Sequence, residues 1–287
     1  MTQQILGKTK LLGVIGDPVE HSLSPVMHNA AIAALGLDYV YIPLPVKGED
    51  LSRALAGLEA INVVGFNVTI PHKQALVPLL ADVSPEAQLV GATNTIWRTP
   101  SGWSGTNTDV EGFIAPLKAV ARDWSRISPV ILGNGGAARA VVVGCWQLGC
   151  SQIHVVGRSE QKLQQFLHSW TDPALQKALT VHQSDLPALL SQTQLLVNTT
   201  PVGMFPQTDA SPLDEELVSK LQPATIVYDL IYNPNPTRLL KQAQERGAIA
   251  INGLEMLVQQ GAAALKIWLQ QDVPVEVMRQ SLRQYLG

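Results

Sequence analysis

Lys73 and Asp109 are the residues best suited to acid–base chemistry. Lys73 ends the segment "NVTIPHK", in which "NVTI" is typical of a strand and Pro71 of the first position of a helix. A lysine at the start of a helix opposes the helix dipole, so it either points into solvent or serves a reaction such as proton transfer. Asp109, in "GTNTDVEGF", is expected at a second helix start, where its carboxylate would orient the Lys73 ammonium group if the two lie close together.

A glycine-rich turn could hold phosphate groups. The segment "VILGNGGAARA" places Gly133-Asn134-Gly135-Gly136-Ala137 after a strand and before a helix. Gly133 would allow the tight turn, Gly135 would let the backbone approach a pyrophosphate, and the helix N-terminus would hold the negative charge. Such a turn can be merely structural, but the strand and the helix around this one favour dinucleotide binding.

The next predicted strand ends in Gly157-Arg158-Ser159, at the position where an NAD site usually carries an acidic residue. A guanidinium group suits the bidentate capture of a phosphate. Arg158 therefore predicts NADP rather than NAD, and the alternative is a solvated surface arginine.

Ser22 and Ser24 precede a predicted helix in the segment "EHSLSPVMHN". Their hydroxyls, together with the free N–H groups of the helix start, would suit a carboxylate. The alternative is simple capping of the helix by Ser24, with Pro25 at its first position.

Two successions of strands and helices position these residues, and they predict an α/β fold with two domains. Residues 1–109 and 254–287 are expected to form a substrate-binding domain that the C-terminal helices complete. Residues 110–253 are expected to form a doubly wound Rossmann domain that binds NADP. The region 95–109 has hairpin-like spacing and is expected at the edge of the first sheet. The second succession contains six strand-like runs, at 129–133, 152–157, 179–183, 194–200, 225–230 and 248–253.

The composition narrows the class of protein. The 287 residues are 46% hydrophobic and carry a net charge of −3, which is globular and offers no basic field for nucleic acid. No apolar run is long enough to span a membrane, and no signal peptide is recognised, so a cytoplasmic protein is expected. No His/Cys cluster has the spacing of a metal site. Cys145 and Cys150 are expected on one helix, roughly 7.5 Å apart along its axis, and hence as free thiols.

The chain resembles the shikimate dehydrogenase family in eight segments that occur in the family's order. These segments are "GDPVEHSLSPVMHN", "GFNVTIPHK", "GATNT", "GTNTDVEGF", "LGNGGAARA", "NTTPVGM", "YDLIYNP" and "GLEMLVQQGA". The resemblance implies reversible, NADPH-dependent reduction of 3-dehydroshikimate to shikimate in aromatic amino acid biosynthesis. The family's adenosine-binding stretch commonly reads Asn-Arg-Thr, whereas this chain has Gly157-Arg158-Ser159, which keeps the charged member and loses the amide.

The resemblance also implies individual roles. Lys73 would be the catalytic acid–base group, in contact with the substrate and paired with Asp109. Ser22 and Ser24 would bind the substrate carboxylate. The further substrate contacts would be Thr69, Asn94, Asp109, Tyr232 and Gln260. The NADP contacts would be Gly133, Asn134, Gly135, Gly136, Ala137, Gly157, Arg158, Ser159, Glu160, Gln161, Lys162, Leu230 and Gly253.

Two alternatives stay open at this point. One is a quinate/shikimate dehydrogenase that uses NAD, and the other is a non-catalytic protein that binds NADP as a signal. All three readings expect a small-molecule ligand and neither a nucleic acid nor a membrane partner. The sequence is compatible with a homodimer and does not fix the oligomeric state.

Overall fold

The computed structural model describes residues 4–287 and divides the chain into two compact units. Unit 1 contains the chain up to Gly112 together with Leu257–Gly287, and unit 2 contains Phe113–Met256. The sequence places these boundaries after residues 109 and 253. Within the described residues, no helix is long and apolar enough to cross a membrane.

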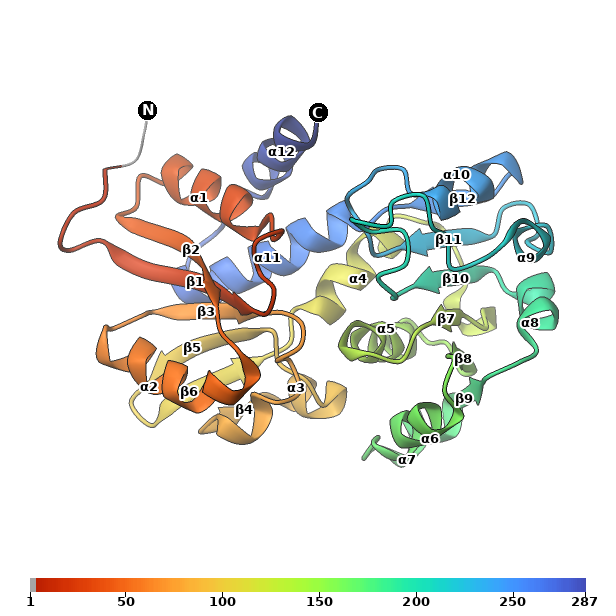
Figure 1. Ribbon diagram of the computed structural model, residues 1–287, viewed down its shortest axis with the longest axis horizontal. Coiled ribbons are helices and arrows are strands. Elements are labelled where there is room, and N and C mark those ends of the chain that lie inside the picture. The colour runs from red at the N-terminus through yellow and green to blue at the C-terminus, as the bar shows by residue number, and fades with distance from the viewer. Residues whose placement is uncertain (1–3) are drawn as a thin grey trace. The chain divides into compact units, whose positions relative to one another are not determined.

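Unit 1 is built on a mixed sheet with the strand order β2-β1-β3-β5-β6-β4 (Figure 1). The strands β2 (Tyr39–Pro45), β1 (Lys10–Gly16) and β3 (Gly65–Val68) run parallel to one another. The strands β5 (Thr95–Thr99) and β6 (Gly102–Thr106) form an antiparallel hairpin beside β3.

The predicted place of this hairpin at the edge of the sheet is wrong. A further strand, β4 (Asp82–Val83), pairs with β6 and forms the edge. Two residues are too few to show the alternation of side chains that identifies a strand in a sequence. The hairpin consequently lies inside the sheet. Because β6 has a paired strand on each side, its end and the residues that follow it are held in place.

Helices from both ends of the chain complete unit 1. Its helices are α1 (Ser24–Ala34), α2 (Leu51–Ala60), α3 (Pro85–Val90) and α12 (Val275–Leu286), together with short 3-10 turns at 48–50 and 77–79. The chain passes from unit to unit within α4 (Asp109–Lys118) and α11 (Leu254–Leu269). Because α12 packs against α1, the C-terminal segment belongs to the first unit.

A close approach of α11 to the sheet depends on Gly65. A methyl group added at Gly65 would lie 2.2 Å from Nε1 of Trp268, whose N–H donates to the carbonyl of Ile96 at 2.8 Å. We expect Gly65→Ala to lower the free energy of unfolding by about 1–3 kcal/mol, because this contact leaves no room for the methyl group. The matched control is Gly57→Ala in α2, where nothing lies within 4 Å and a gain of about 0.5–1 kcal/mol is expected. Urea unfolding of both variants measures the change in the free energy of unfolding, which should be negative for Gly65→Ala and positive for Gly57→Ala. Equal changes in the two variants would contradict this explanation.

Unit 2 is a six-stranded parallel sheet with the order β12-β11-β10-β7-β8-β9 (Figure 1). Read from β9 to β12, with β7 counted as the first strand of the unit, this is the 3-2-1-4-5-6 order of a doubly wound Rossmann sheet. It confirms the predicted fold class. The six strands are β7 (Val130–Leu132), β8 (Ile153–Val156), β9 (Leu179–His182), β10 (Leu195–Asn198), β11 (Ile226–Asp229) and β12 (Ile249–Ile251).

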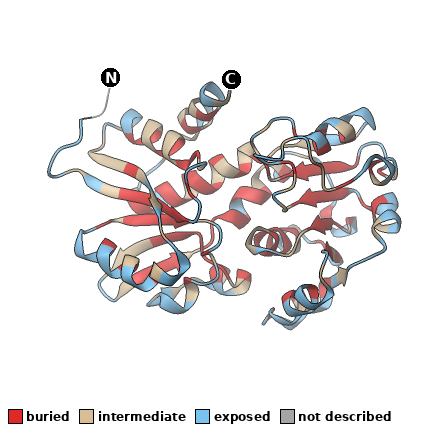
Figure 2. Ribbon diagram, viewed as in Figure 1, coloured by how far each residue is buried: buried red, intermediate tan, exposed pale blue. Residues whose placement is uncertain are grey.

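The strands of unit 2 alternate with helices and form a continuous apolar core. The helices are α5 (Gly136–Gln147), α6 (Glu160–His168), α7 (Pro173–Ala178), α8 (Leu186–Gln192), α9 (Glu215–Val218) and α10 (Arg238–Glu245). Every residue of β7, β10 and β11 is buried (Figure 2), as expected for the central strands of a parallel sheet covered on both faces.

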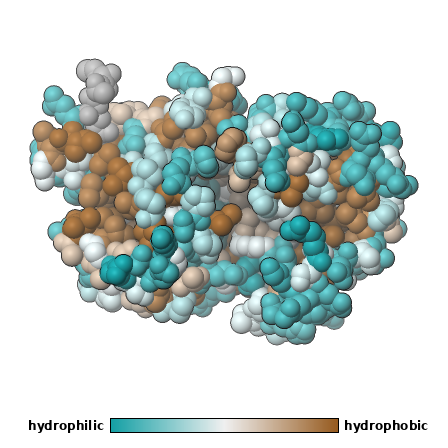
Figure 3. Space-filling view, viewed as in Figure 1, coloured by the Kyte–Doolittle hydropathy of each residue, from teal (hydrophilic) through white to brown (hydrophobic). Residues whose placement is uncertain are grey.

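Some large hydrophobic residues reach the surface, where they lie among hydrophilic ones on the face shown in Figure 3. Ile70 is 68% exposed although it directly follows the buried strand β3 and Thr69. The exposed side chain marks the point at which the backbone leaves the sheet, three residues before Lys73. Scattered exposed apolar residues are common in folded proteins and do not by themselves indicate a partner.

Candidate active site

Lys73 and Asp109 form an ion pair in unit 1. The Nζ atom of Lys73 donates to Oδ2 of Asp109 at 2.6 Å, and the two side chains are only 16% and 7% exposed. Among residues 4–287, Asp109 is the hydrogen-bond partner found for this ammonium group, which has three N–H donors. Two donors can therefore turn toward a small molecule without breaking the pair.

The predicted helix start at Pro71 is wrong. Residues 70–71 and 73–76 lie in turns, followed only by a 3-10 turn at 77–79. The carbonyl of Lys73 accepts a hydrogen bond from the backbone N–H of Thr93 at 2.8 Å. His72 is buried, and its Nε2–H donates to the carbonyl of Val46 at 2.6 Å. Contacts with distant segments thus hold the turn, and the helix-dipole argument for Lys73 does not apply.

Asn94 connects the ion pair to α11. Its Nδ2 group donates to Oδ1 of Asp109 at 2.9 Å and lies 3.3 Å from Oε1 of Gln260. Its Oδ1 atom accepts from the backbone N–H of Thr108 at 2.8 Å. Asn94, Asp109 and Gln260 are all buried, so their polar groups are held in one orientation. The structure therefore brings together four of the residues singled out in the sequence, from segments as far apart as residues 73 and 260.

Ser22, Ser24 and Thr69 lie in segments that follow the carboxyl ends of two strands of unit 1. The serines follow β1 and the threonine follows β3, and these two parallel strands end side by side. The backbone N–H of Thr69 donates to the carbonyl of Ile15 at 2.8 Å. Ligands of open α/β sheets bind at the carboxyl ends of the strands, so all three hydroxyls occupy a suitable place.

Ser24 does not cap α1. The helix begins at Ser24 itself, Leu23 is the N-cap residue, and no side chain caps the helix start. The Ser24 side chain is buried near the Tyr41 hydroxyl instead. The capping alternative is therefore overturned for Ser24, whose own N–H donates to the Ser22 hydroxyl at 3.3 Å.

A buried polar chain that the sequence did not reveal lies beneath these residues. The Tyr41 hydroxyl donates to Oδ1 of Asn67 at 2.7 Å, and Nδ2 of Asn67 donates to the carbonyl of Asn94 at 3.0 Å. Burial raises the pKa of Tyr41 well above its ordinary value, so its hydroxyl stays protonated. The chain links Tyr41 to Asn94 through the sheet. The signal for Asn67 was an amide within an apolar strand, whereas nothing in the sequence distinguished Tyr41.

His28 packs against this chain without joining it. Its ring stacks on that of Tyr41 with 4.2 Å between centroids, and within the described part of the chain neither ring nitrogen has a hydrogen-bond partner. Burial lowers the pKa of His28 from 6.5 to about 3. His28 is therefore neutral at physiological pH.

We expect this burial to make folding sensitive to acid. Between about pH 3 and 6.5 the unfolded chain protonates His28 whereas the folded chain does not, so stability is complete above the unfolded pKa and falls as the pH drops below it. From pH 7 to 5 the loss amounts to about 2 kcal/mol. His28→Phe keeps the ring stack and should remove this part of the pH dependence. Urea unfolding at several pH values compares the two proteins, and parallel curves would contradict the expectation.

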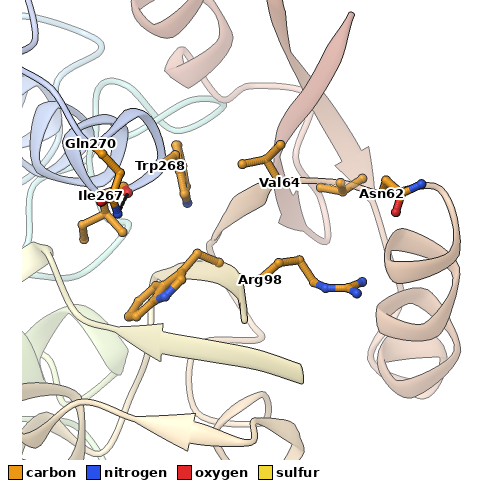
Figure 4. A pocket seen from close by; sticks show the side chains of 8 residues that line it. Asn62, Val64, Arg98, Ile267, Trp268 and Gln270 are labelled. Atoms are coloured by element: carbon orange, nitrogen blue, oxygen red, sulfur yellow. Dashed lines mark hydrogen bonds between the residues drawn. The ribbon is translucent and has the colours of Figure 1, made fainter. Parts of the chain in front are cut away.

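Two cavities of unit 1 lie apart from the ion pair. One of about 350 Å³ lies between β3, β5 and the end of α11, where Trp268 and Ile267 face Val64 and Arg98 (Figure 4). The other, of about 870 Å³, is lined by residues of α3, α4 and α11 and by the segment 106–108. Neither is lined by a residue singled out in the sequence. The assignment of the site therefore rests on the hydrogen-bonded network and not on a hollow in the unit.

The glycine-rich turn of unit 2 has the form that a phosphate site needs. Gly133 has a φ of +103°, and a methyl group there would lie 2.7 Å from Oγ1 of Thr199. Gly135 precedes α5 in extended conformation and has no neighbour within 4 Å of an added methyl group. The first turn of α5 contains no acidic residue. The open backbone and the positive helix end together fit a pyrophosphate.

The loop after β8 carries the charge expected for a second phosphate. Arg158 is exposed, and its carbonyl accepts from Nε2 of Gln183 at 3.1 Å. Ser159 caps α6 and accepts from the N–H of Lys162 at 3.4 Å. An added methyl group at Gly157 would lie 3.0 Å from Leu163, so this position has little room for the amide that the resemblance leads one to expect.

A buried arginine joins the two helices of the cofactor region. Nη1 of Arg139 in α5 donates to the Ser169 hydroxyl at the end of α6 at 2.6 Å, and its guanidinium lies 4.2 Å from the Trp170 ring centroid. Burial lowers the pKa of Arg139 to about 10, so the group remains charged at neutral pH. A cation at the negative end of α6 is favourable and fixes α6 against α5.

Leu230 and Gly253 meet at the carboxyl end of β11. The N–H of Gly253 donates to the carbonyl of Ile231 at 3.1 Å, and a methyl group at Gly253 would lie 1.9 Å from the carbonyl oxygen of Leu230. Asp229, whose pKa is raised by burial, accepts from Asn198, from Thr237 and from the N–H of Ile231. This second missed network fixes the loop that carries Leu230 and Tyr232. Tyr232 belongs to unit 2, so its proposed contact with the substrate remains a prediction.

The Rossmann sheet with its phosphate turn, together with a unit that holds a buried lysine–aspartate pair, defines a dinucleotide-dependent oxidoreductase of two α/β units. Residues 14–96 match the family model of the shikimate dehydrogenase substrate binding domain, and residues 253–283 match that of the shikimate 5'-dehydrogenase C-terminal domain. A shikimate dehydrogenase (NADP(+)) of Gloeothece citriformis is 66% identical over 284 residues, which cover 99% of each chain. The chain belongs to the shikimate dehydrogenase family.

Solved structures agree with this assignment. A shikimate dehydrogenase from Aquifex aeolicus superposes with a TM-score of 0.88 at 36% identity and covers 98% of this chain and 100% of its own. The shikimate 5-dehydrogenase of Thermus thermophilus, solved in complex with NADP(H) and shikimate, has a TM-score of 0.84 at 33% identity and covers 96% and 99%. The similarity extends over both units of the chain.

Proposed function

We propose that this protein catalyses the reversible, NADPH-dependent reduction of 3-dehydroshikimate to shikimate, with Lys73 and Asp109 as its acid–base pair. The buried contact of 2.6 Å between these two side chains is the observation that carries the proposal. Identity of 66% to a shikimate dehydrogenase (NADP(+)) over nearly the whole chain supports the choice of substrate and cofactor.

Lys73 acts on the oxygen of the reacting carbonyl group. Bound NADPH supplies the hydride for the carbonyl carbon, and negative charge then develops on the oxygen. The Lys73 ammonium group stabilises this charge and donates a proton to the oxygen, and in the reverse direction neutral Lys73 accepts the proton of the hydroxyl. Asp109, itself held by Asn94, keeps the ammonium group in place throughout.

The substrate would be recognised through its carboxylate and its hydroxyls. Ser22 and Ser24 are proposed to bind the carboxylate, since both lie in the connection between the carboxyl end of β1 and the first turn of α1. The proposed ring-hydroxyl contacts are Thr69, Asn94, Asp109 and Gln260, with Tyr232 as a further contact. A site built from hydrogen-bonding groups rejects analogues that lack the matching hydroxyls, because its buried groups would be left unpaired.

The cofactor would bind along the loops at the carboxyl ends of β7, β8 and β11. The turn Gly133 to Ala137 is proposed to hold the pyrophosphate at the start of α5. Arg158 and Ser159 are proposed to hold the adenosine 2′-phosphate, with Glu160, Gln161 and Lys162 in the first turn of α6 beside them. Leu230 and Gly253 would contact the nicotinamide.

The assay that tests this function follows the absorbance of the nicotinamide while shikimate is oxidised with NADP or with NAD. We expect turnover with shikimate and NADP, and a much lower kcat/KM with quinate or with NAD. Comparable activity on quinate with NAD would favour the quinate/shikimate alternative. Absence of turnover at high enzyme concentration, together with intact NADP binding, would favour a non-catalytic binding protein.

We also propose a cytoplasmic homodimer as the working form. Both cysteines are free thiols, which suits a reducing compartment, and two-fold dimers are the commonest oligomers of soluble proteins. Light scattering coupled to size-exclusion chromatography measures the mass directly, and a monomer at micromolar concentration would contradict the dimer.

A further inference from the structure

The end of α5 brings Cys145 and Cys150 together. The helix stops at Gln147, and Gly149 takes a left-handed conformation with a φ of +102°. The N–H of Cys150 donates to the carbonyl of Cys145, and the N–H of Gly149 donates to the carbonyl of Trp146, each at 3.0 Å. These two bonds define a Schellman motif, in which the side chains three positions before and two positions after the helix cap meet.

The meeting side chains are here two thiols. Both cysteines are free and buried, and the two thiols are close enough for each to shift the pKa of the other. The sequence-based expectation that an axial rise of roughly 7.5 Å separates them is wrong, because Cys150 lies beyond the helix end and the chain folds back over the last turn. Disulfide formation is therefore not excluded by distance.

We propose that Cys145 and Cys150 are a dithiol–disulfide pair that low-molecular-weight disulfides oxidise and dithiols reduce. The backbone already holds the two residues together, with the N–H of Cys150 bonded to the carbonyl of Cys145, so closing the bond requires rotation of side chains rather than a new fold. Gly149, Ser151 and Gln152, which flank Cys150, are exposed, so a small local opening of the turn brings Cys150 to solvent.

Each cysteine has a distinct part in the exchange. The hydrogen bond from Cys145 lowers the pKa of Cys150, whereas burial raises the pKa of Cys145. The Cys150 thiolate attacks one sulfur of the small disulfide, breaks its S–S bond and releases one thiolate, which leaves a mixed disulfide on Cys150. Cys145 then loses its proton to solvent and attacks the Cys150 sulfur, which releases the second thiolate. Two protein thiols are oxidised, and one small disulfide is reduced to two thiols.

The pair lies at the end of α5 opposite to the phosphate-binding turn. A helix of twelve residues separates the two ends by about 18 Å. The disulfide would join the end of α5 to the segment that leads into β8. Neither cysteine, and no residue between them, is a proposed catalytic or binding residue. We therefore expect oxidation to stabilise unit 2 while kcat stays unchanged.

Redox titration of the folded, full-length protein tests the pair. The protein is equilibrated in buffers of reduced and oxidised glutathione, free thiols are blocked with iodoacetamide, and tryptic peptides are weighed. Both cysteines fall in one peptide, residues 140–158, because the chain has no Lys or Arg between Arg139 and Arg158. Oxidation should convert this peptide from its doubly alkylated form to an unalkylated form lighter by two hydrogen atoms than the free dithiol.

Two single variants provide the controls. In Cys145→Ser the mixed disulfide should persist on Cys150, and in Cys150→Ser the peptide should resist oxidation, because the remaining thiol has a raised pKa. The melting temperature should rise by a few degrees on oxidation of the wild type and of neither variant. The proposal is overturned if the wild-type peptide stays doubly alkylated at every glutathione ratio, if it closes only in urea that unfolds the protein, or if the bond joins two chains on a non-reducing gel.

Discussion

Lys73→Ala is expected to lower kcat by about 10²–10⁴-fold while leaving the affinity for shikimate largely unchanged. The substitution removes the group that donates the proton and stabilises charge on the carbonyl oxygen, and it leaves Asn94, Gln260 and the serines in place. Steady-state kinetics gives kcat and KM, and titration of the inactive variant gives the dissociation constant of shikimate. A large rise in KM with an unchanged kcat would assign Lys73 to binding instead.

Three further proteins make this result specific. Lys47→Ala removes an exposed lysine of the same unit and should behave as the wild type. Asp109→Asn keeps the shape of the partner and removes its charge, so kcat should fall here as well. Because the two side chains act as one unit, the double variant should be about as slow as Lys73→Ala alone. Additive losses would mean that Lys73 and Asp109 act independently, in conflict with the contact of 2.6 Å between them.

The parts of the fold that could be predicted are those that local sequence determines. The phosphate turn lies in one continuous segment, and the Gly133 turn, the α5 start and the strand before it each carry their own signal. The parallel direction of the strands in unit 2 follows from the alternation of strands and helices, because parallel strands need crossover connections.

The parts that could not be predicted depend on contacts between distant segments. The turn that carries Lys73 has helix-like sequence signals, yet Thr93 and the carbonyl of Val46 hold it in another conformation. Tyr41 in β2 and Asn67 in β3 meet although β1 lies between their strands, and a single sequence does not reveal the register that brings them together. The position of Cys150 relative to Cys145 depends on Gly149. The predicted helix continued to Cys150, about one turn beyond the observed helix end, and so kept apart two residues that the turn at Gly149 brings together.

Arg158→Ala is expected to raise the KM for NADPH by about 10–100-fold and to leave the KM for NADH nearly unchanged. Charge-assisted bonds to a phosphate contribute about 1.5–3 kcal/mol, and NADH has no 2′-phosphate to lose them. The ratio of kcat/KM for NADPH to kcat/KM for NADH should fall by the same factor. Arg126→Ala, which removes another exposed arginine of unit 2, is the matched control and should leave both values unchanged.

The ratio of the KM values for NADPH and NADH distinguishes loss of the phosphate contact from general damage to the loop. The Arg158 carbonyl is held by Gln183, and Ser159 caps α6, so the backbone of the loop does not depend on the arginine side chain. A variant with a distorted loop would bind NADH worse as well, because both cofactors share the adenosine. Salt should weaken NADPH binding by the wild type more than by the variant, since an exposed guanidinium–phosphate contact is screened. An unchanged cofactor preference would leave Arg158 as a solvated surface residue and would move the choice of NADP to other groups of the loop.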